Sequence, residues 1–348
     1  MDPIIPIPDS VPVHWLWFQV LLLLTFVLHL IMMNLILGGS LITLWDTFIR
    51  KSKTQYSGSL PVLIALTINL GVPPLLFVQV LYGNLFYSSA VTLAVPWILV
   101  IPVLILAYYG SYVFVKNSER APLWSRAGLI LSSLFILYVG FMYVNNSTLT
   151  INPAAMQSHL DDPGGMNLNM GDKSLWPRYL HFIVAAIAVA SLGIAVYAKF
   201  SFKDDTEAMA AVIKSNLKRF AWFTLAQFIF GTLFWLTTPK HVWMTFMGQN
   251  IPATILMILS WLIIISMILS AFRGKLWPTV IHALLVIIIM AVMREFMRSA
   301  YLAEIFKPSQ LEVVNKYSPL IVFLVVFLTG LYMIYYMIQL ATNKNEKS

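Results

Sequence analysis

The sequence has 348 residues, of which 59% are hydrophobic and only 10% are charged, with a formal net charge of +8 at pH 7. A chain of this composition is typical of an integral membrane protein and not of a soluble globular domain. It contains no cysteine, which excludes disulfides, thiolate metal sites and covalent c-type haem attachment. Any haem would have to be held through His, Met or a carboxylate.

Long apolar runs separated by charges and turn residues predict nine membrane-spanning helices, because about 20 apolar residues are needed to cross the hydrocarbon core. We expect them over residues 15–45, 59–82, 91–115, 125–145, 177–199, 218–238, 250–272, 276–299 and 318–341. The predicted fold class is therefore all-α, a polytopic membrane helix bundle. Nothing indicates a second, soluble domain, so residues 1–348 are expected to form a single integral membrane domain.

Basic residues gather in every second loop, which predicts the orientation of the helices. The loops after the first, third, fifth and seventh spans contain Arg50, Lys51, Lys53, Lys116, Arg120, Arg126, Lys203, Lys214, Lys218, Arg219, Arg273 and Lys275. By the positive-inside rule these loops are cytoplasmic, which leaves the N-terminus outside and the C-terminus in the cytoplasm. Topology thus accounts for the positive charge, and we expect no nucleic-acid partner. The loop after the eighth span, with Arg298, Lys307 and Lys316, fits the rule less well.

The longest predicted outer loop covers residues 145–177 and is rich in Asn, Asp, Gly and Pro. This composition favours turns over helix, and we expect an ordered cap over the start of the fifth span. His159 in this loop, and His14 and His241 at predicted interfaces, are interpreted as solvated or interfacial side chains and not as ligands. His282, near the cytoplasmic end of the eighth span, is interpreted as a structural or hydrogen-bonding residue.

Three spans carry ionisable side chains at depths where such groups usually have a function. The fifth begins W-P-R-Y-L-H-F, with Arg178 and His181 in its first turn. His181 fits a haem ligand, but it also fits a residue that bonds a neighbouring helix or reaches the headgroups. The first span contains His29, followed nine and ten residues later by Gly38 and Gly39, a pattern compatible with a haem pocket or with simple helix packing.

The eighth span ends M-R-E-F-M-R-S-A-Y-L, which places Arg294, Glu295 and Arg298 within one and a half turns. Such a group is either an interfacial salt-bridge cluster or a haem ligand flanked by propionate partners. At 1.5 Å per residue, His181 and Glu295 fall in the outer quarter of the bundle, Met257 about 10 Å inside the seventh span, and His29 near mid-span. Four potential axial ligands thus share the outer half.

The order and context of these residues resemble subunit I of the cytochrome bd quinol oxidases, a family with nine spans, an external N-terminus and haems near the outer face. The matching segments are His29 with Leu37-Gly38, the second-span sequence I-N-L-G-V-P-P-L-L-F-V-Q-V-L-Y-G-N-L-F-Y-S-S with Gly71 and Gly83, Tyr179-Leu180-His181-Phe182, and E-F-M-R-S-A-Y with Glu295 and Arg298. The last of these is the most specific local match.

The resemblance implies one to three haems, of type b, with haem d possible. It implies that His181 and Met257 ligate the iron of a low-spin haem b, with Arg178 pairing a propionate. His29 and Glu295 would ligate iron at a separate high-spin site, with Arg298 in the place of the family's arginine. The resemblance also implies an oxidoreductase of the cytochrome bd type.

Three departures from the family pattern change the expected activity. The loop between the sixth and seventh spans is only T-T-P-K-H-V-W-M-T-F-M-G-Q-N, the third span has no paired glutamates, and Gln79 stands where the family places a glutamate in the second span. We therefore expect weak or absent quinol-driven oxygen reduction, because protons need ionisable residues along their path.

The interpretation we favour is a multi-pass protein of the bacterial cytoplasmic membrane that passes electrons at the periplasmic face, with a periplasmic cytochrome c or a second membrane subunit as partner. One alternative is a quinol-dependent oxygen reductase with a rebuilt quinol site. Another is a haem-free transporter or assembly factor whose substrate site is a helix broken at Gly71-Val72-Pro73-Pro74.

Overall fold

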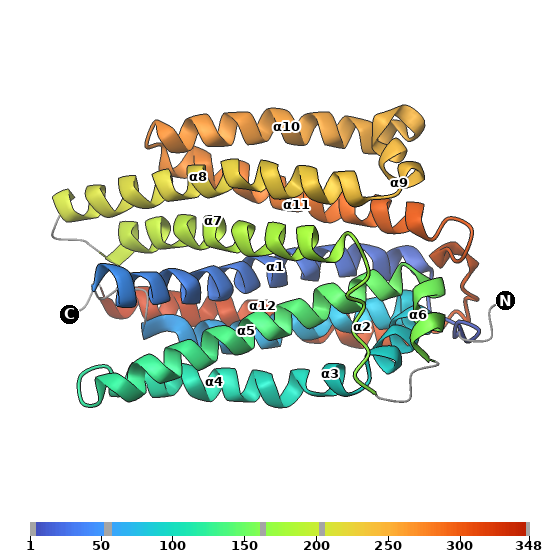
Figure 1. Cartoon of the computed structure of the whole chain (residues 1–348), viewed down its shortest axis with the longest axis horizontal. Helices are drawn as coiled ribbons and strands as arrows, with labels where there is room; N and C mark the ends of the chain where they lie inside the picture. The colour runs from blue at the N-terminus through green and yellow to red at the C-terminus, as the bar shows by residue number, and fades with distance from the viewer. Residues whose placement is uncertain (1–4, 52–57, 161–164, 202–205, 346–348) are drawn as a thin grey trace.

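The structure is a computed structural model that describes residues 5–51, 58–160, 165–201 and 206–345. These residues form an all-α bundle of long helices that run along one axis (Figure 1). The long helices are α1 (Trp15–Trp45), α2 (Leu60–Leu93), α4 (Val100–Asn117), α5 (Pro122–Thr150), α7 (Leu175–Ser201), α8 (Thr206–Thr237), α10 (Ile251–Phe272), α11 (Leu276–Tyr301) and α12 (Ser318–Asn345). The short elements are the π-helices η1 (Asp46–Arg50) and η3 (Thr245–Gln249), the α-helices α3 (Val95–Ile98), α6 (Pro153–Leu160) and α9 (Lys240–Met244), and the 3-10 turn η4 (Pro308–Gln310).

The bundle has the dimensions and surface of a membrane protein. Eight of the described helical segments are long and apolar enough to cross a bilayer, and α12 contributes a further apolar stretch, Ser318–Met333. Large apolar side chains on their outward faces, such as Ile101, Leu262 and Val326, are exposed. Exposed apolar surface along the whole length of a helix is stable only against lipid or another apolar partner. The predicted all-α polytopic membrane fold is therefore confirmed.

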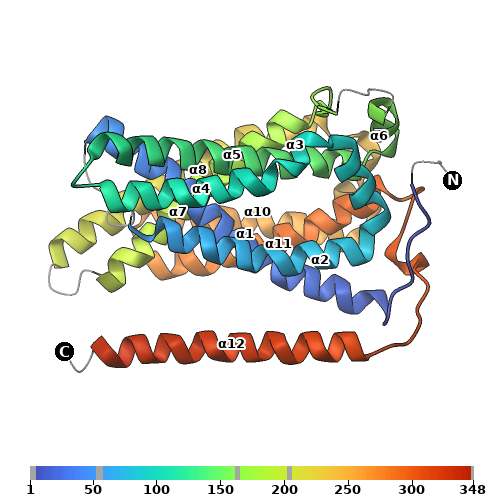
Figure 2. The same cartoon turned by 90° about the horizontal axis from the view of Figure 1, so that it is seen from below.

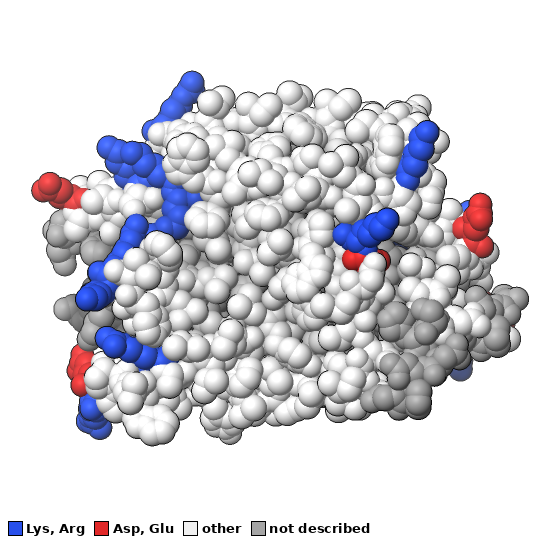
Figure 3. All heavy atoms as spheres, in the orientation of Figure 1, with Lys and Arg blue, Asp and Glu red and all other residues white. Residues whose placement is uncertain are grey.

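The two ends of the bundle differ in charge. The end of α1, the end of α7, the start of α8 and the α4–α5 and α10–α11 connections lie together, at the left of Figure 1, and the start of α1 lies at the opposite end. Lys and Arg side chains gather at this first end (Figure 3), which we call the basic end, and we call the opposite one the cap end. Lys53 and Lys203 lie outside the described residues. The predicted alternation of basic and less basic loops is thus reproduced by the folded chain.

Helix α2 is longer than the sequence pattern indicates, because it continues past residue 82 to Leu93. Its hydroxyl groups are used inside the bundle: the Ser89 hydroxyl accepts from Asn146 Nδ2 at 3.0 Å and lies 3.0 Å from Thr150 Oγ1. The helix runs on through Pro73 and Pro74, and the residue with non-helical backbone angles is Tyr82. The described chain is therefore not broken at the prolines, where a transporter site was considered.

The segment expected to be a turn-rich outer loop is partly helical. Helix α5 extends to Thr150, and α6 follows, capped by Asn152, whose side chain accepts from the backbone N–H of Ala155 at 3.3 Å, and begun by Pro153. An Asn cap followed by Pro is a strong helix start. Here it outweighs the turn-rich composition from which a loop was expected. His159 lies in α6, and its side chain is outside the described part of the chain.

Small residues allow the central helices to approach closely. A Cβ added at Gly38 of α1 would overlap the backbone carbonyl of Ala186 in α7, and one added at Gly193 of α7 would overlap Leu35. Backbone contact through small residues is the usual way in which helices associate in a membrane. Of the two interpretations of Gly38, the structure supports helix packing.

Helix α12 lies at the edge of the bundle (Figure 2). Its first turns are held at the cap end, where Leu320 is buried and the Phe323 ring meets Phe77 of α2 at 5.0 Å between centroids. The segment before α12 also pairs with the N-terminal segment: the backbone N–H of Val11 donates to Glu312 O at 2.7 Å and that of Val314 donates to Val11 O at 2.9 Å. These contacts fix the start of α12 and leave its apolar outer face exposed.

The Gly38 contact gives a direct test of the packing. We expect Gly38→Ala to lower the thermal unfolding midpoint of the detergent-solubilised chain, because separating α1 from α7 costs about 1–3 kcal/mol. The matched control is Gly330→Ala in α12, where an added Cβ meets nothing within 4 Å; this variant should unfold at the wild-type midpoint or slightly above it. Equal midpoints for both variants would contradict the packing described.

Candidate functional site

His29 of α1 is fixed by a hydrogen bond to the neighbouring helix. Its Nδ1 lies 3.1 Å from the carbonyl oxygen of Thr67 in α2, and because a carbonyl only accepts, Nδ1 carries the proton. The ring also lies against Gly71, where an added Cβ would come within 2.8 Å of Cε1. A histidine whose Nδ1 donates to a backbone carbonyl keeps the lone pair of Nε2 free, which is the usual arrangement of a metal-ligating imidazole.

His181 of α7 faces α8. An added Cβ at Gly231 would lie 3.4 Å from its Cε1 and its Nδ1, so this glycine makes room for the ring. The main chain of Gln227 lies close enough to interact with the imidazole. Within the described residues, however, the buried Nδ1 atom has no hydrogen-bond partner at good distance and angle. A buried imidazole nitrogen without a good partner is costly in an apolar bundle.

Arg178 lies one turn before His181, under the cap. Its Nη1 donates to Ser147 Oγ at 3.5 Å and its guanidinium lies 4.8 Å from the centroid of the Phe234 ring. Its Nε and Nη2 are buried and have no hydrogen-bond partner within the described residues. Two buried guanidinium donors without acceptors indicate a place for an anionic group.

The cap over Arg178 is ordered by buried asparagines, as the sequence predicts. The backbone N–H of Asn169 donates to Asn145 Oδ1 at 3.1 Å, and Asn169 Nδ2 donates to Thr148 Oγ1 at 3.0 Å. These bonds tie the segment before α7 to the end of α5, where Ser147 is located. The cap therefore joins the start of α7 to the end of α5 and positions the Ser147 hydroxyl that Arg178 reaches.

Glu295 and Arg298 of α11 form a buried ion pair. Arg298 Nη1 lies 2.9 Å from Glu295 Oε2, and the two side chains are only 9% and 14% exposed. The Arg298 guanidinium also lies 4.6 Å from the centroid of the Tyr82 ring, so the irregular turn of α2 faces this pair. The structure contains the salt bridge that one interpretation of the sequence proposed.

Arg294 connects the α11 pair to the two histidine-bearing helices. Its guanidinium lies 4.6 Å from the ring centroid of Phe26, which is located three residues before His29 on α1. Arg294 is close enough to Arg298 and Glu295, and to Arg178 of α7, for their charges to influence one another. Arg298 is buried, whereas Arg294 is exposed.

We call Arg178, Arg294, Arg298 and Glu295 the arginine cluster. Asp172, which accepts from the backbone N–H of Ser174 at 2.7 Å, interacts with Arg178 from the edge of the cluster. Three guanidinium groups thus share two carboxylates at the cap end of an apolar bundle. A surplus positive charge at this depth is unfavourable unless an anion joins it.

Met257 of α10 is not placed with His181 by any contact that the structure records. Its carbonyl accepts from the Ser260 hydroxyl at 2.7 Å, and α8 lies between α7 and α10 (Figure 1).

His282 of α11 lies 3.4 Å from Ser266 Oγ through its Nε2, so the expected hydrogen-bonding role of His282 is confirmed. His14 accepts from the backbone N–H of Leu16 at 3.3 Å as a helix cap.

A cavity of about 860 Å³ opens at the cap end beside the arginine cluster. Tyr301 and Asp172, which both interact with Arg178, line it. Glu304, His241 and Lys173 also line it. A volume of this size fits an organic ligand or the approach of a partner's side chains.

Several residues of the site could not be found from the sequence. Thr67 holds His29 through its main chain, so its side-chain type carries no signal. Phe26, Tyr82 and Phe234 meet the arginines only across helices, and aromatic residues are common throughout the chain. Among the described residues, no group of three or more His, Asp or Glu side chains gathers as a metal-ion site, whereas haem ligation needs only one or two.

Comparison of the chain with known protein families, curated proteins and solved structures finds no match. The function must therefore be inferred from the residues and their geometry.

The buried ion pair gives the second prediction. Glu295→Gln keeps the shape of the side chain and removes the charge, which leaves three guanidinium groups with one peripheral carboxylate. We expect destabilisation of about 3 kcal/mol, measured as a lower thermal midpoint of the purified chain. Glu304→Gln, an exposed change on the same end of the bundle, is the control and should be neutral. An unchanged midpoint for Glu295→Gln would show that the cluster does not depend on this carboxylate.

Proposed function

We propose that this chain is a haem-binding membrane protein that transfers electrons, of the type of cytochrome bd subunit I. The observation that supports this most directly is the arginine cluster, which brings three guanidinium groups and the carboxylate of Glu295 together, with Asp172 at its edge, close to the helices that carry His29 and His181. Haem supplies both of the missing components: an iron that takes imidazole ligands and two propionates that take guanidinium partners.

The residues present fit this group. His181 offers an imidazole without a well-made hydrogen bond and Arg178 offers two free buried donors one turn away, so together they would hold one haem b and one of its propionates. His29, held by Thr67, and Glu295 would ligate iron at a second, high-spin site, with Arg298 and Arg294 as propionate partners. Met257 is proposed as the second ligand of the His181 haem on the resemblance alone.

When bound, haem supplies one-electron chemistry, with a potential that depends on its axial ligands and surroundings. The chain would orient the two imidazoles through the Thr67 carbonyl and the α7–α8 contact. Arg178, Arg294 and Arg298 would hold positive charge where the haem propionates bind. The chain's buried asparagines hold the segment before α7 against the end of α5. Positive charge near a haem favours the reduced, less positive iron.

We propose that the basic end faces the cytoplasm of a bacterium and the cap end faces the periplasm, by the positive-inside rule. Electrons would then enter or leave at the periplasmic face, where the 860 Å³ cavity is lined by Asp172 and Glu304. Carboxylates at such a site suit a partner with a basic docking surface. A periplasmic cytochrome c or a second redox subunit is the partner class proposed.

The histidine assignment is tested by absorption spectroscopy. We expect His181→Ala to remove the low-spin b-type signal from the reduced-minus-oxidised spectrum while the chain stays in the membrane, because the ligand is lost. His282→Ala, which removes another histidine of the bundle that bonds Ser266, is the matched control and should keep the spectrum. A low-spin signal that survives His181→Ala would refute the assignment of this ligand.

The partner assignment is tested with an oxygen electrode and a spectrophotometer. We expect the purified chain to exchange electrons with reduced cytochrome c. We also expect little oxygen uptake with a reduced short-chain quinol, because the segment Val95–Asn117 contains no carboxylate that could deliver protons. The boiled protein is the control for both donors. Rapid oxygen uptake with quinol alone would instead support a quinol oxidase with a rebuilt quinol site.

A further inference from the structure

A second cavity, of about 480 Å³, lies at the basic end between α7, α8 and the α10–α11 connection. Four cationic side chains line it: Lys199 near the end of α7, Lys214 and Lys218 on α8, and Arg273 in the connection. They come from three separate parts of the chain that meet in space. We call this cavity the basic pocket.

The basic pocket has no anionic partner of its own in the described chain. Its lining contains no carboxylate, and none of its four cations takes part in a recorded salt bridge within the described residues. Asp204 and Asp205 lie outside the described residues. Four positive charges around one cavity repel one another, so an anion bound among them would be stabilised.

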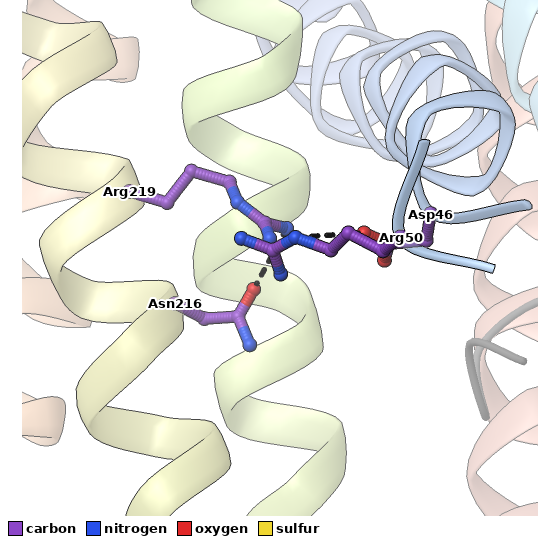
Figure 4. Close-up of polar contacts among 4 residues, drawn as sticks. All are labelled: Asp46, Arg50, Asn216 and Arg219. Carbon is purple, nitrogen blue, oxygen red and sulfur yellow. Dashed lines mark hydrogen bonds and ion pairs between the residues drawn. The ribbon is translucent and has the colours of Figure 1, made fainter. Parts of the chain in front are cut away.

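A cluster of charged residues around Asp46 at this end differs from the basic pocket. Asp46, whose side chain is 6% exposed, lies 3.7 Å from Arg50 Nε, and Arg219 approaches it from α8 while bonding Asn216 Oδ1 at 3.3 Å (Figure 4). This cluster contains its own carboxylate, whereas the lining of the basic pocket contains none. The basic pocket is therefore distinct from the ordinary charge pairing at the basic end.

The walls of the basic pocket are apolar and aromatic. Leu276 is buried in its lining, and Phe272 and Trp277 are exposed. The Trp277 ring meets Phe200 at 6.2 Å and the Phe272 ring meets Trp222 at 5.6 Å between centroids. Exposed aromatic side chains at helix ends mark the headgroup level of a bilayer. A soluble anion would gain nothing from these walls, whereas acyl chains would pack on them.

We propose that the basic pocket binds the phosphate of an anionic phospholipid, with the lysines and Arg273 around the phosphate and the acyl chains along Trp277 and Phe272. Basic pockets between transmembrane helices on the cytoplasmic side are established sites for such headgroups. The positive-inside rule requires basic loops, but it does not require four cations from three segments to converge on one aromatic-walled cavity. This site does not depend on the proposed redox function.

The test counts bound lipid on the full detergent-purified chain by native mass spectrometry during titration with dioleoyl phosphatidylglycerol. We expect Lys214→Gln/Lys218→Gln to bind this lipid roughly tenfold more weakly than wild type, since each basic residue near the surface contributes severalfold. Lys214→Arg/Lys218→Arg keeps both charges and should restore binding. The matched control, Lys116→Gln/Arg120→Gln, removes two charges at the same end of the bundle outside the pocket and should bind as wild type does.

Three outcomes would overturn the proposal. Equal retention of dioleoyl phosphatidylcholine would show that the negative headgroup charge is not recognised. Displacement of the lipid by inorganic phosphate at the same concentration would identify a free-anion site instead. Equal loss of binding in the pocket and control variants would show that overall charge, and not this pocket, attracts the lipid.

Discussion

The structure depends on how an apolar bundle accommodates three arginines near one of its ends. Arg178 enters from α7, and Arg294 and Arg298 from α11, while Glu295 neutralises one of them at 2.9 Å. Aromatic faces from α1, α2 and α8 cover all three guanidinium groups, which contributes cation–π stabilisation but no negative charge. The cluster thus holds more positive than negative charge, so an anion bound beside it would be stabilised.

Helix packing explains how the two histidines are oriented. Gly38 brings α1 into contact with the backbone of α7, and Gly193 of α7 makes room for the Leu35 side chain of α1, which fixes the relative rotation of the two helices that carry His29 and His181. Gly71 and Gly231 then leave space for the imidazoles against α2 and α8. Small residues therefore have two uses in the structure: Gly38 packs helices, and Gly71 and Gly231 leave space for the imidazole rings. The haem pocket that the sequence also allows beside His29 stays a prediction.

Much of this arrangement follows from local sequence rules. Apolar length and basic loops predict the helices and their alternation, and the i,i+3 spacing of Glu295 and Arg298 predicts their ion pair. The extension of α2 to Leu93 was not predictable in this way, because it includes Ser89, whose hydroxyl accepts a hydrogen bond from Asn146 and shares one with Thr150 in another helix. The same holds for Thr67, which reaches His29 through a main-chain carbonyl. Contacts made across helices, and those made by the backbone, leave no periodic signal.

The proposed haem function accounts for the surplus charge and for the free donors of Arg178 together. The measurement that tests it most directly is the haem content of the wild-type chain, purified from a haem-sufficient bacterial host and assayed as the pyridine haemochrome. The proposal predicts a b-type spectrum with at least one haem per chain, and loss of haem when Arg178 and Arg294 are both replaced by Gln. A folded, monodisperse wild-type chain without haem would contradict the proposal and would leave the arginine cluster in need of a different anion.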